Sequence, residues 1–229
     1  PLAGEAEDAE LVEIVQPGDT LSKILLGSGI ATGDIEAIAA VLEGGDPDRD
    51  PPFFFQKNPD DLDPSGTLPY PRRTGEVHHE VELLVALSAG GRDIAVADAL
   101  DAVWGYAVAL DMTRRDVQAE AKRLGRPWEL AKAFERSAPV GPIVPVSASG
   151  HLSAGAIRLD VNGETRQAGD LLQMIWKVPE MISYLSEHVT LAPGDVILSG
   201  TPSGVGPVVR GDAMHAAIEG LPPLDVTVE

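Results

Sequence analysis

The chain has 229 residues, of which 44% are hydrophobic, so it can bury a proper core and form one large domain, with or without a small appendage. Its formal net charge of -19 argues against nucleic acid and anionic membrane surfaces as partners. The lack of cysteine excludes disulfides and thiol catalysis, and no apolar run approaches membrane-spanning length. We therefore expect a cytoplasmic protein.

The first 50 residues are expected to form a segment of their own, because the charged, proline-rich stretch 46–52 is the best boundary candidate in the chain. The run Gly-Asp-Thr-Leu-Ser at 18–22 resembles the start of LysM-like carbohydrate-binding modules, and a generic helical hairpin is the alternative. Two short helices are expected here, the second on apolar residues at helical spacing: Ile35, Ile38, Ala39 and Leu42.

Residues 51–229 are expected to form the main domain. Strands and helices are interleaved irregularly there, which predicts a mixed α/β sheet fold rather than a doubly wound one. The expected strands cover 53–57, 76–88, a hairpin at 157–167 around Asn162-Gly163, and 196–199. The expected helices cover 96–106, 111–124, 128–134 and 171–187, the last kinked at Pro179.

A pair of carboxylates is the first candidate for chemistry. The apolar positions in 77–85 predict a strand whose other face carries His78, Glu80 and Glu82. Two charged carboxylates side by side are costly, and a hard divalent cation such as Mg²⁺ or Mn²⁺ removes that cost. Taken alone, however, a Glu-x-Glu pair is more typical of a solvated strand face.

Asp111 ends the apolar run 106–110 and could supply a third oxygen ligand. Arg115 and Gln118 follow it at helical spacing, which predicts that the three residues share one helix face. The alternative for Arg115 is a surface cation paired with an acidic neighbour.

Six motifs extend this pattern over the rest of the domain. They are Phe-Phe-Phe-Gln-Lys at 53–57, Val-His-His-Glu-Val-Glu-Leu at 77–83, Gly-Tyr-Ala-Val-Ala-Leu-Asp-Met-Thr-Arg-Arg-Asp at 105–116, Gly-Arg-Pro-Trp-Glu-Leu-Ala-Lys at 125–132, Gln-Met-Ile-Trp at 173–176 and Gly-Asp-Val-Ile-Leu-Ser-Gly-Thr-Pro-Ser-Gly-Val-Gly at 194–206. In their order and spacing they resemble the fumarylacetoacetate hydrolase family, and within it the fumarylpyruvate hydrolase branch.

This resemblance implies a β-sandwich roll, usually a homodimer, and an Mg²⁺ or Mn²⁺ ion held by Glu80, Glu82 and Asp111. It also implies a small anionic keto acid as substrate, in aromatic catabolism. The residues that it places around the substrate are Arg115, Gln118, Lys132, Gly200 and Thr201. We add His78 as a group behind the metal ligands or a base, and Lys57 as a cation at the rim of the site or a strand terminus.

The chemistry of these residue types suits cleavage of a C–C bond beside a ketone. Such cleavage needs a carbanion leaving group, and a divalent cation chelated by the keto-acid oxygens holds its charge as an enolate. Lys132 and Arg115 would add cationic stabilisation in a net acidic protein. The Thr201 hydroxyl and the N–H groups of the glycine-rich loop would suit a carboxylate.

The sequence departs from the family in its first part. The resemblance would assign a His–Glu pair on a short lid helix to activate the hydrolytic water, but residues 12–45 contain no histidine. Three interpretations follow: a hydrolase of fumarylpyruvate or a related acylpyruvate, with a base from elsewhere such as His78; a decarboxylase of an oxaloacetate-like β-keto acid, which needs no activated water; or a catalytically poor keto-acid or carbohydrate-binding protein. We favour the first interpretation.

Overall fold

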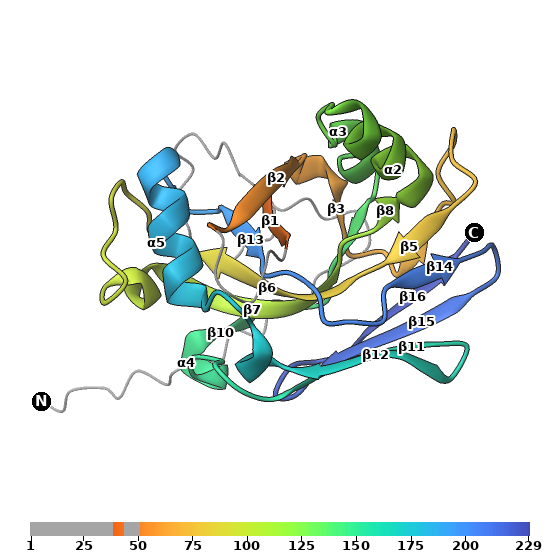
Figure 1. Ribbon diagram of the computed structural model, residues 1–229. Coiled ribbons are helices and arrows are strands. Elements are labelled where there is room, and N and C mark those ends of the chain that lie inside the picture. Colours follow the sequence, from red (N-terminus) through yellow and green to blue (C-terminus); the bar gives the residue numbers. More distant parts are fainter. Residues whose placement is uncertain (1–38, 44–50) are drawn as a thin grey trace, which may run out of the picture.

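The computed structural model describes residues 39–43 and 51–229. Two main sheets lie one above the other as a mixed α/β roll, the expected fold class (Figure 1). The six-stranded sheet has the order β10 (Val144–Pro145), β7 (Val103–Leu110), β6 (Val81–Leu87), β13 (Val196–Leu198), β1 (Ala39–Glu43) and β2 (Phe53–Lys57). The five-stranded sheet has the order β12 (Glu164–Asp170), β11 (Ala156–Val161), β15 (Ala213–Ile218), β16 (Leu224–Val228) and β4 (Thr67–Leu68).

Two small sheets and the helices cover the edges of this roll. The small sheets are β14 (Gly206–Val208), β5 (Val77–His79) and β8 (Thr113–Arg114), and β3 (Leu62–Asp63) with β9 (Ala138–Pro139). The α-helices are α2 (Arg115–Leu124), α3 (Glu129–Lys132), α4 (Val146–Ser149) and α5 (Val178–His188), and the 3₁₀ helices are η1 (Pro59–Asp61), η2 (Ala99–Ala102) and η3 (Leu171–Gln173). Helices α2 and α3 lie together at one end and α5 at the other (Figure 1). No helix in the described part of the chain is long and apolar enough to span a bilayer.

Strand β6 lies at the centre of the hydrophobic core and is buried on both faces. Leu83, Val85 and Leu87 pack in the larger core cluster, which includes residues of the five-stranded sheet. Leu84 and Ala86, on the opposite face, pack in a second cluster with residues of β7 and β13. Glu82 lies at alternate positions with Leu84 and Ala86 and therefore points to this second face. Because the sheet is buried on both sides, the Glu82 carboxylate lies inside the protein.

Several elements agree with the sequence-based expectations. Strand β2 covers 53–57 as predicted. The hairpin β11–β12 turns at Asn162-Gly163, where φ is 53° and 79°, the left-handed values of a two-residue type I′ turn.

Three predicted helices are wrong in part. Residues 39–43, expected in a helix, form β1, which pairs with β13 and β2; the rest of the segment before residue 51 lies outside the described residues. The helix expected over 96–106 is only η2, and β7 begins at Val103, because a run buried on both faces has no helical period. The helix expected over 171–187 begins at Val178, and Pro179 lies in its first turn, where its missing N–H costs nothing.

Candidate active site

Strand pairing brings three carboxylates together. Glu80 lies between β5 and β6, and β6 pairs with the antiparallel β7 so that Val81 is opposite Leu110. Glu80 directly precedes Val81 and Asp111 directly follows Leu110, so the two residues are neighbours across the strands. The Asp111 N–H donates to the Glu80 carbonyl at 2.8 Å. Oxygens of Glu80, Glu82 and Asp111 all lie within 4.8 Å of one another. Asp111 thus meets the two glutamates from the end of β7. The prediction that Asp111 shares a helix face with Arg115 is wrong, because α2 begins only at Arg115.

These carboxylates are almost completely withdrawn from solvent. The exposed fractions of Glu80, Glu82 and Asp111 are 4%, 1% and 0%. Glu82 Oε2 accepts the N–H of Gly200 at 2.8 Å, whereas its buried Oε1 has no hydrogen-bond partner among the described residues. The alternative of a solvated strand face is therefore wrong, and so much buried negative charge requires compensating cations.

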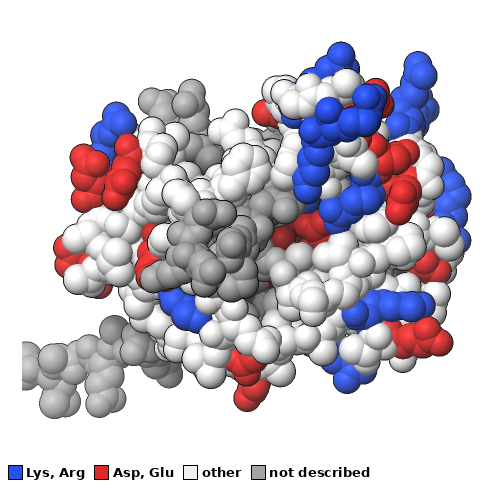
Figure 2. Space-filling view, in the orientation of Figure 1, with Lys and Arg blue, Asp and Glu red and all other residues white. Residues whose placement is uncertain are grey.

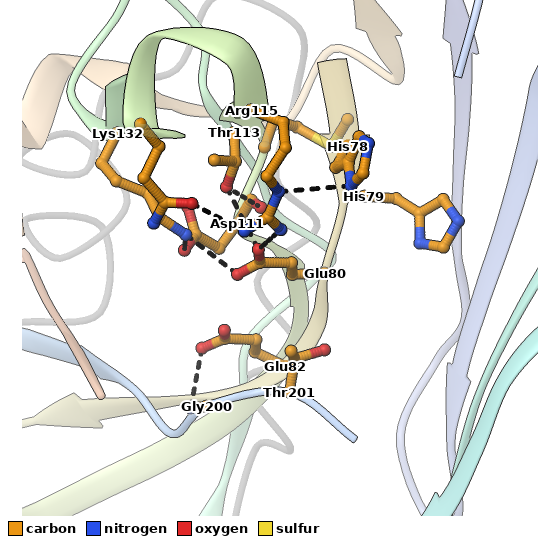
Figure 3. A network of polar contacts seen from close by, with 12 residues as sticks. His78, His79, Glu80, Glu82, Asp111, Thr113, Arg115, Lys132, Gly200 and Thr201 are labelled. Atoms are coloured by element: carbon orange, nitrogen blue, oxygen red, sulfur yellow. Dashed lines mark hydrogen bonds and ion pairs between the residues drawn. The ribbon is translucent and has the colours of Figure 1, made fainter. Parts of the chain in front are cut away.

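Lys132, at the end of α3, supplies part of that compensation. Its Nζ lies 2.7 Å from Asp111 Oδ2 and 2.9 Å from Glu80 Oε2, and its side chain is 0% exposed. The ammonium also lies over the Phe55 ring, 4.7 Å from the centroid. Figure 3 shows Lys132, Glu80 and Asp111 converging on one point. The structure therefore brings Lys132 to the carboxylates, as the sequence predicts.

Lys57, at the end of β2, is a second buried cation. Its Nζ lies 2.7 Å from Asp111 Oδ1, with both side chains 0% exposed. It also donates to the Ser137 hydroxyl at 3.0 Å and to the carbonyl oxygens of Lys132 and Ser137. This buried position, behind Asp111, differs from the expected rim of the site, whereas the alternative of a strand terminus is confirmed because Lys57 is the last residue of β2.

Arg115 opens α2 and forms an ion pair with Glu80 Oε1. Its Nη1 donates to Gln118 Oε1 at 2.6 Å, one turn further along the helix, and its Nε donates to His78 Nδ1 at 3.2 Å. His78 Nε2 is in turn 2.7 Å from Glu76 Oε1. The structure thus brings Arg115 and Gln118 together with the carboxylates, and His78 contacts the site through Arg115.

Burial and neighbouring charges separate the pKa values of the three carboxyls. Burial, followed by the Asp111 charge, raises the pKa of Glu80 to about 7, against opposing effects of Lys132 and Arg115. Burial and the charges of Asp111 and Glu80 raise the pKa of Glu82 well above its usual value. For Asp111, burial is outweighed by the Lys132 and Lys57 ammoniums, which hold its pKa below the ordinary range.

A cavity of about 390 Å³ adjoins the carboxylates through Gly200. Gly200 and Thr201 line it, as does Pro202 from the same loop. The Thr201 hydroxyl donates to the Val81 carbonyl at 2.8 Å, so its hydrogen is directed at the protein backbone. The other lining residues are Ile157, Ala168, Asp170, Leu171, Gln173, Met174, Ile175, Ser199 and Ser203.

The surface beside the site is basic although the chain is acidic. Lys and Arg side chains gather over α2 and α3, next to a hollow in which acidic side chains are visible (Figure 2). Lys122 and Arg123 lie in the last turn of α2, and Arg126 follows it. An anion approaching from this side would meet positive charge first.

Sequence reasoning missed Gln167, whose side chain is completely buried and contacts the Thr201 hydroxyl. The one indication of its role is its place in β12, where Gln167 is the buried residue and an apolar side chain would be usual. His79, expected to pack, is 1% exposed and points away from the carboxylates (Figure 3).

Comparisons with known proteins agree with this fold. Residues 29–229 match the family model described as fumarylacetoacetate (FAA) hydrolase C-terminal. A fumarylpyruvate hydrolase from Ralstonia sp is 42% identical over 177 residues, 77% of this chain and 92% of that protein. The human protein named oxaloacetate tautomerase FAHD1, mitochondrial, is 44% identical over 179 residues, 78% of this chain and 81% of that protein.

A solved structure is also similar to this chain in sequence and fold. The fumarylpyruvate hydrolase from Pseudomonas aeruginosa in complex with Mn²⁺ and pyruvate is 48% identical, with a TM-score of 0.81, and covers 83% of this chain and 88% of its own. The buried carboxylates and the roll thus define a protein of a metal-binding hydrolase or isomerase type. The chain belongs to the fumarylacetoacetate hydrolase family.

Proposed function

We propose that the protein is a metal-dependent hydrolase that cleaves a C–C bond in a diketo acid such as fumarylpyruvate, giving fumarate and pyruvate. The observation that carries this proposal is the buried cluster of Glu80, Glu82 and Asp111, with Lys132 and Arg115 directed at it. The relatives named fumarylpyruvate hydrolase support the substrate class.

The three carboxylates fit an Mg²⁺ or Mn²⁺ ion. They are hard oxygen donors, and Glu82 Oε1 is buried without a hydrogen bond in the described part of the chain. Two oxygens bound to one such ion at ~2.1 Å lie roughly 3–4 Å apart, so the observed spacing within 4.8 Å needs only small side-chain rotations. The bound ion would act as a Lewis acid on the keto-acid oxygens.

The side chains around the cluster would orient and stabilise the substrate. Lys132 and Arg115 bring two positive charges beside the carboxylates, where a substrate gains negative charge as the C–C bond breaks. Gln118, hydrogen-bonded to Arg115, restricts the guanidinium. The cavity beside Gly200 and Thr201 has room for the acyl part of the substrate.

A second candidate is a tautomerase or decarboxylase of oxaloacetate, reactions that need no activated water. Two observations favour it. Both ring nitrogens of His78 have partners, so its service as a base would require breaking a bond to Arg115 or Glu76. In addition, the relatives named oxaloacetate tautomerase are as similar to this chain as the hydrolase from Ralstonia.

One assay separates these functions. The protein is incubated with Mn²⁺ and either fumarylpyruvate or oxaloacetate, and the loss of diketone or enol absorbance and the release of pyruvate are followed. We expect cleavage of fumarylpyruvate. Turnover of oxaloacetate alone would support the second candidate, and binding of pyruvate without turnover of either compound would support a keto-acid-binding protein.

The affinity for Mn²⁺ is expected to rise with pH up to about pH 7. The pKa of Glu80 is raised to about 7, so below that pH this carboxyl holds a proton that a metal ion must displace, and the raised pKa of Glu82 acts in the same direction. Calorimetric titration at several pH values, in buffers with different ionisation enthalpies, would measure the affinity and the protons released. An affinity that does not change between pH 5.5 and about 7.5 would contradict this assignment.

The homodimer implied by the family resemblance, the role in aromatic catabolism and the division into residues 1–50 and 51–229 stay predictions. Light scattering on the purified chain would check the first.

A further inference from the structure

We propose that Gln167 on β12 is a positioning residue that fastens the loop 199–206 to the sheets and so sets the substrate side of the site. The effect of Gln167 on substrate binding rests on the proposed function, whereas its effect on the position of the loop does not. Four hydrogen bonds of its buried carboxamide hold these segments together.

Every hydrogen-bonding position of the Gln167 carboxamide is used. Its Oε1 lies 3.1 Å from the Val81 N–H and 2.9 Å from His79 Nδ1, and its Nε2 lies 2.8 Å from both Thr201 Oγ1 and the Pro202 carbonyl. The side chain is 0% exposed. One amide therefore joins β12, the β5–β6 segment and the loop.

The orientation of this amide follows from its backbone partners. The Val81 N–H can only donate and the Pro202 carbonyl can only accept, so Oε1 must face the former and Nε2 the latter. His79 Nδ1 then carries the hydrogen that it donates to Oε1. His79 is thereby the donor that holds the amide from this side, and burial lowers the pKa of its ring.

The Thr201 hydroxyl is fixed from two sides. It accepts from Gln167 Nε2 and donates to the Val81 carbonyl, each at 2.8 Å. The preceding residue, Gly200, donates its N–H to Glu82 Oε2. The loop that Gln167 holds at Thr201 therefore places the Gly200 N–H against Glu82, a candidate metal ligand. Residues of the same loop line the cavity.

Close backbone packing gives independent evidence for the same anchor. Gly204 has φ of +103°, and a Cβ there would lie 2.1 Å from the Arg166 carbonyl oxygen, the residue before Gln167. A Cβ on Gly169 would lie 3.0 Å from Pro202 Cβ. The loop thus lies directly on β12 before and after Gln167, and no side chain fits between them.

The variant Gln167→Glu tests the anchor with little change of shape. An ionised carboxylate keeps both acceptors but loses the two hydrogens directed at Thr201 and Pro202. We expect faster amide hydrogen exchange in 199–206 without any ligand, and KM, or the Kd of pyruvate with Mn²⁺ bound, raised about tenfold, as for the loss of ordinary hydrogen bonds. The affinity for Mn²⁺ should fall less than the affinity for pyruvate, because Glu82 loses at most its hydrogen bond from Gly200, and kcat should change less than about twofold. The control is Arg166→Gln, whose side chain is half exposed.

The variant Gly204→Ala displaces the loop by another route and should give the same pattern, which keeps the test decisive if Gln167→Glu does not fold. Unchanged exchange in 199–206 and unchanged pyruvate affinity in both variants would overturn the inference. Loss of Mn²⁺ binding together with pyruvate binding would also overturn it, since the residue would then support the fold as a whole. If the wild-type protein binds neither Mn²⁺ nor pyruvate, the proposed function fails, while hydrogen exchange still decides whether Gln167 anchors the loop.

Discussion

The variant Glu82→Ala is expected to lower Mn²⁺ affinity at least about 100-fold, the upper range seen when even an outer-shell partner of a metal is lost, and to stay folded. Glu82, which is 1% exposed, contributes to the carboxylate cluster a buried oxygen that has no hydrogen bond from any described residue. Its raised pKa shows that holding it charged costs free energy in the metal-free protein. At a pH at which the wild-type carboxyl is charged, its removal should therefore leave the metal-free fold as stable as before or more stable.

The sign of this stability change depends on pH. A carboxyl with a raised pKa in the folded state binds a proton more tightly there than in the unfolded chain, so the free energy of unfolding falls as pH rises from the unfolded value toward the folded pKa. The metal-free wild type should lose stability over that interval, and Glu82→Ala should lose less. Calorimetry with Mn²⁺ and urea unfolding without it would measure both effects, with the exposed Glu187→Ala as control. Mn²⁺ affinity equal to that of the wild type would remove Glu82 from the site.

The variant Lys57→Met is expected to lower the free energy of unfolding by about 3–5 kcal/mol, the cost of leaving a buried charge without its partner. Lys57 and Asp111 are both 0% exposed, and their charged atoms lie 2.7 Å apart. Without this ammonium, Asp111 would face Glu80 and Glu82 with Lys132 as its remaining buried cation, and the carbonyl of Ser137 would lose a donor.

A double-mutant cycle in urea would test the pairing itself. Asp111→Asn removes the charge that Lys57 balances, so Lys57→Met should cost less in that background than in the wild type. Lys122→Met is the matched control, because Lys122 is exposed and its contact with Trp128 is worth about 1 kcal/mol or less. If Lys57→Met costs no more than this control, the ion pair does not support the site.

Much of the site could be predicted from local patterns. A period of two placed Glu80 and Glu82 on one face, and the structure confirms that Glu82 shares a buried face of β6. The place of Arg115 and Gln118 on one helix face is also confirmed, because spacing within a helix is a local property. Residues 103–110 show the limit: a run buried on both faces carries no period, so helix and strand could not be distinguished.

The sequence by itself determined the family resemblance, the two-residue turn at Asn162-Gly163, the spacing of the Glu pair and the residue types of the site. Only the tertiary structure decided that Asp111 meets the pair through the register of β6 and β7, that Lys57 lies behind Asp111, and that Gln167 holds the loop of Thr201. The physical reason is that these three contacts join segments far apart in the chain. Their geometry depends on strand pairing and burial, which local periodicity does not contain.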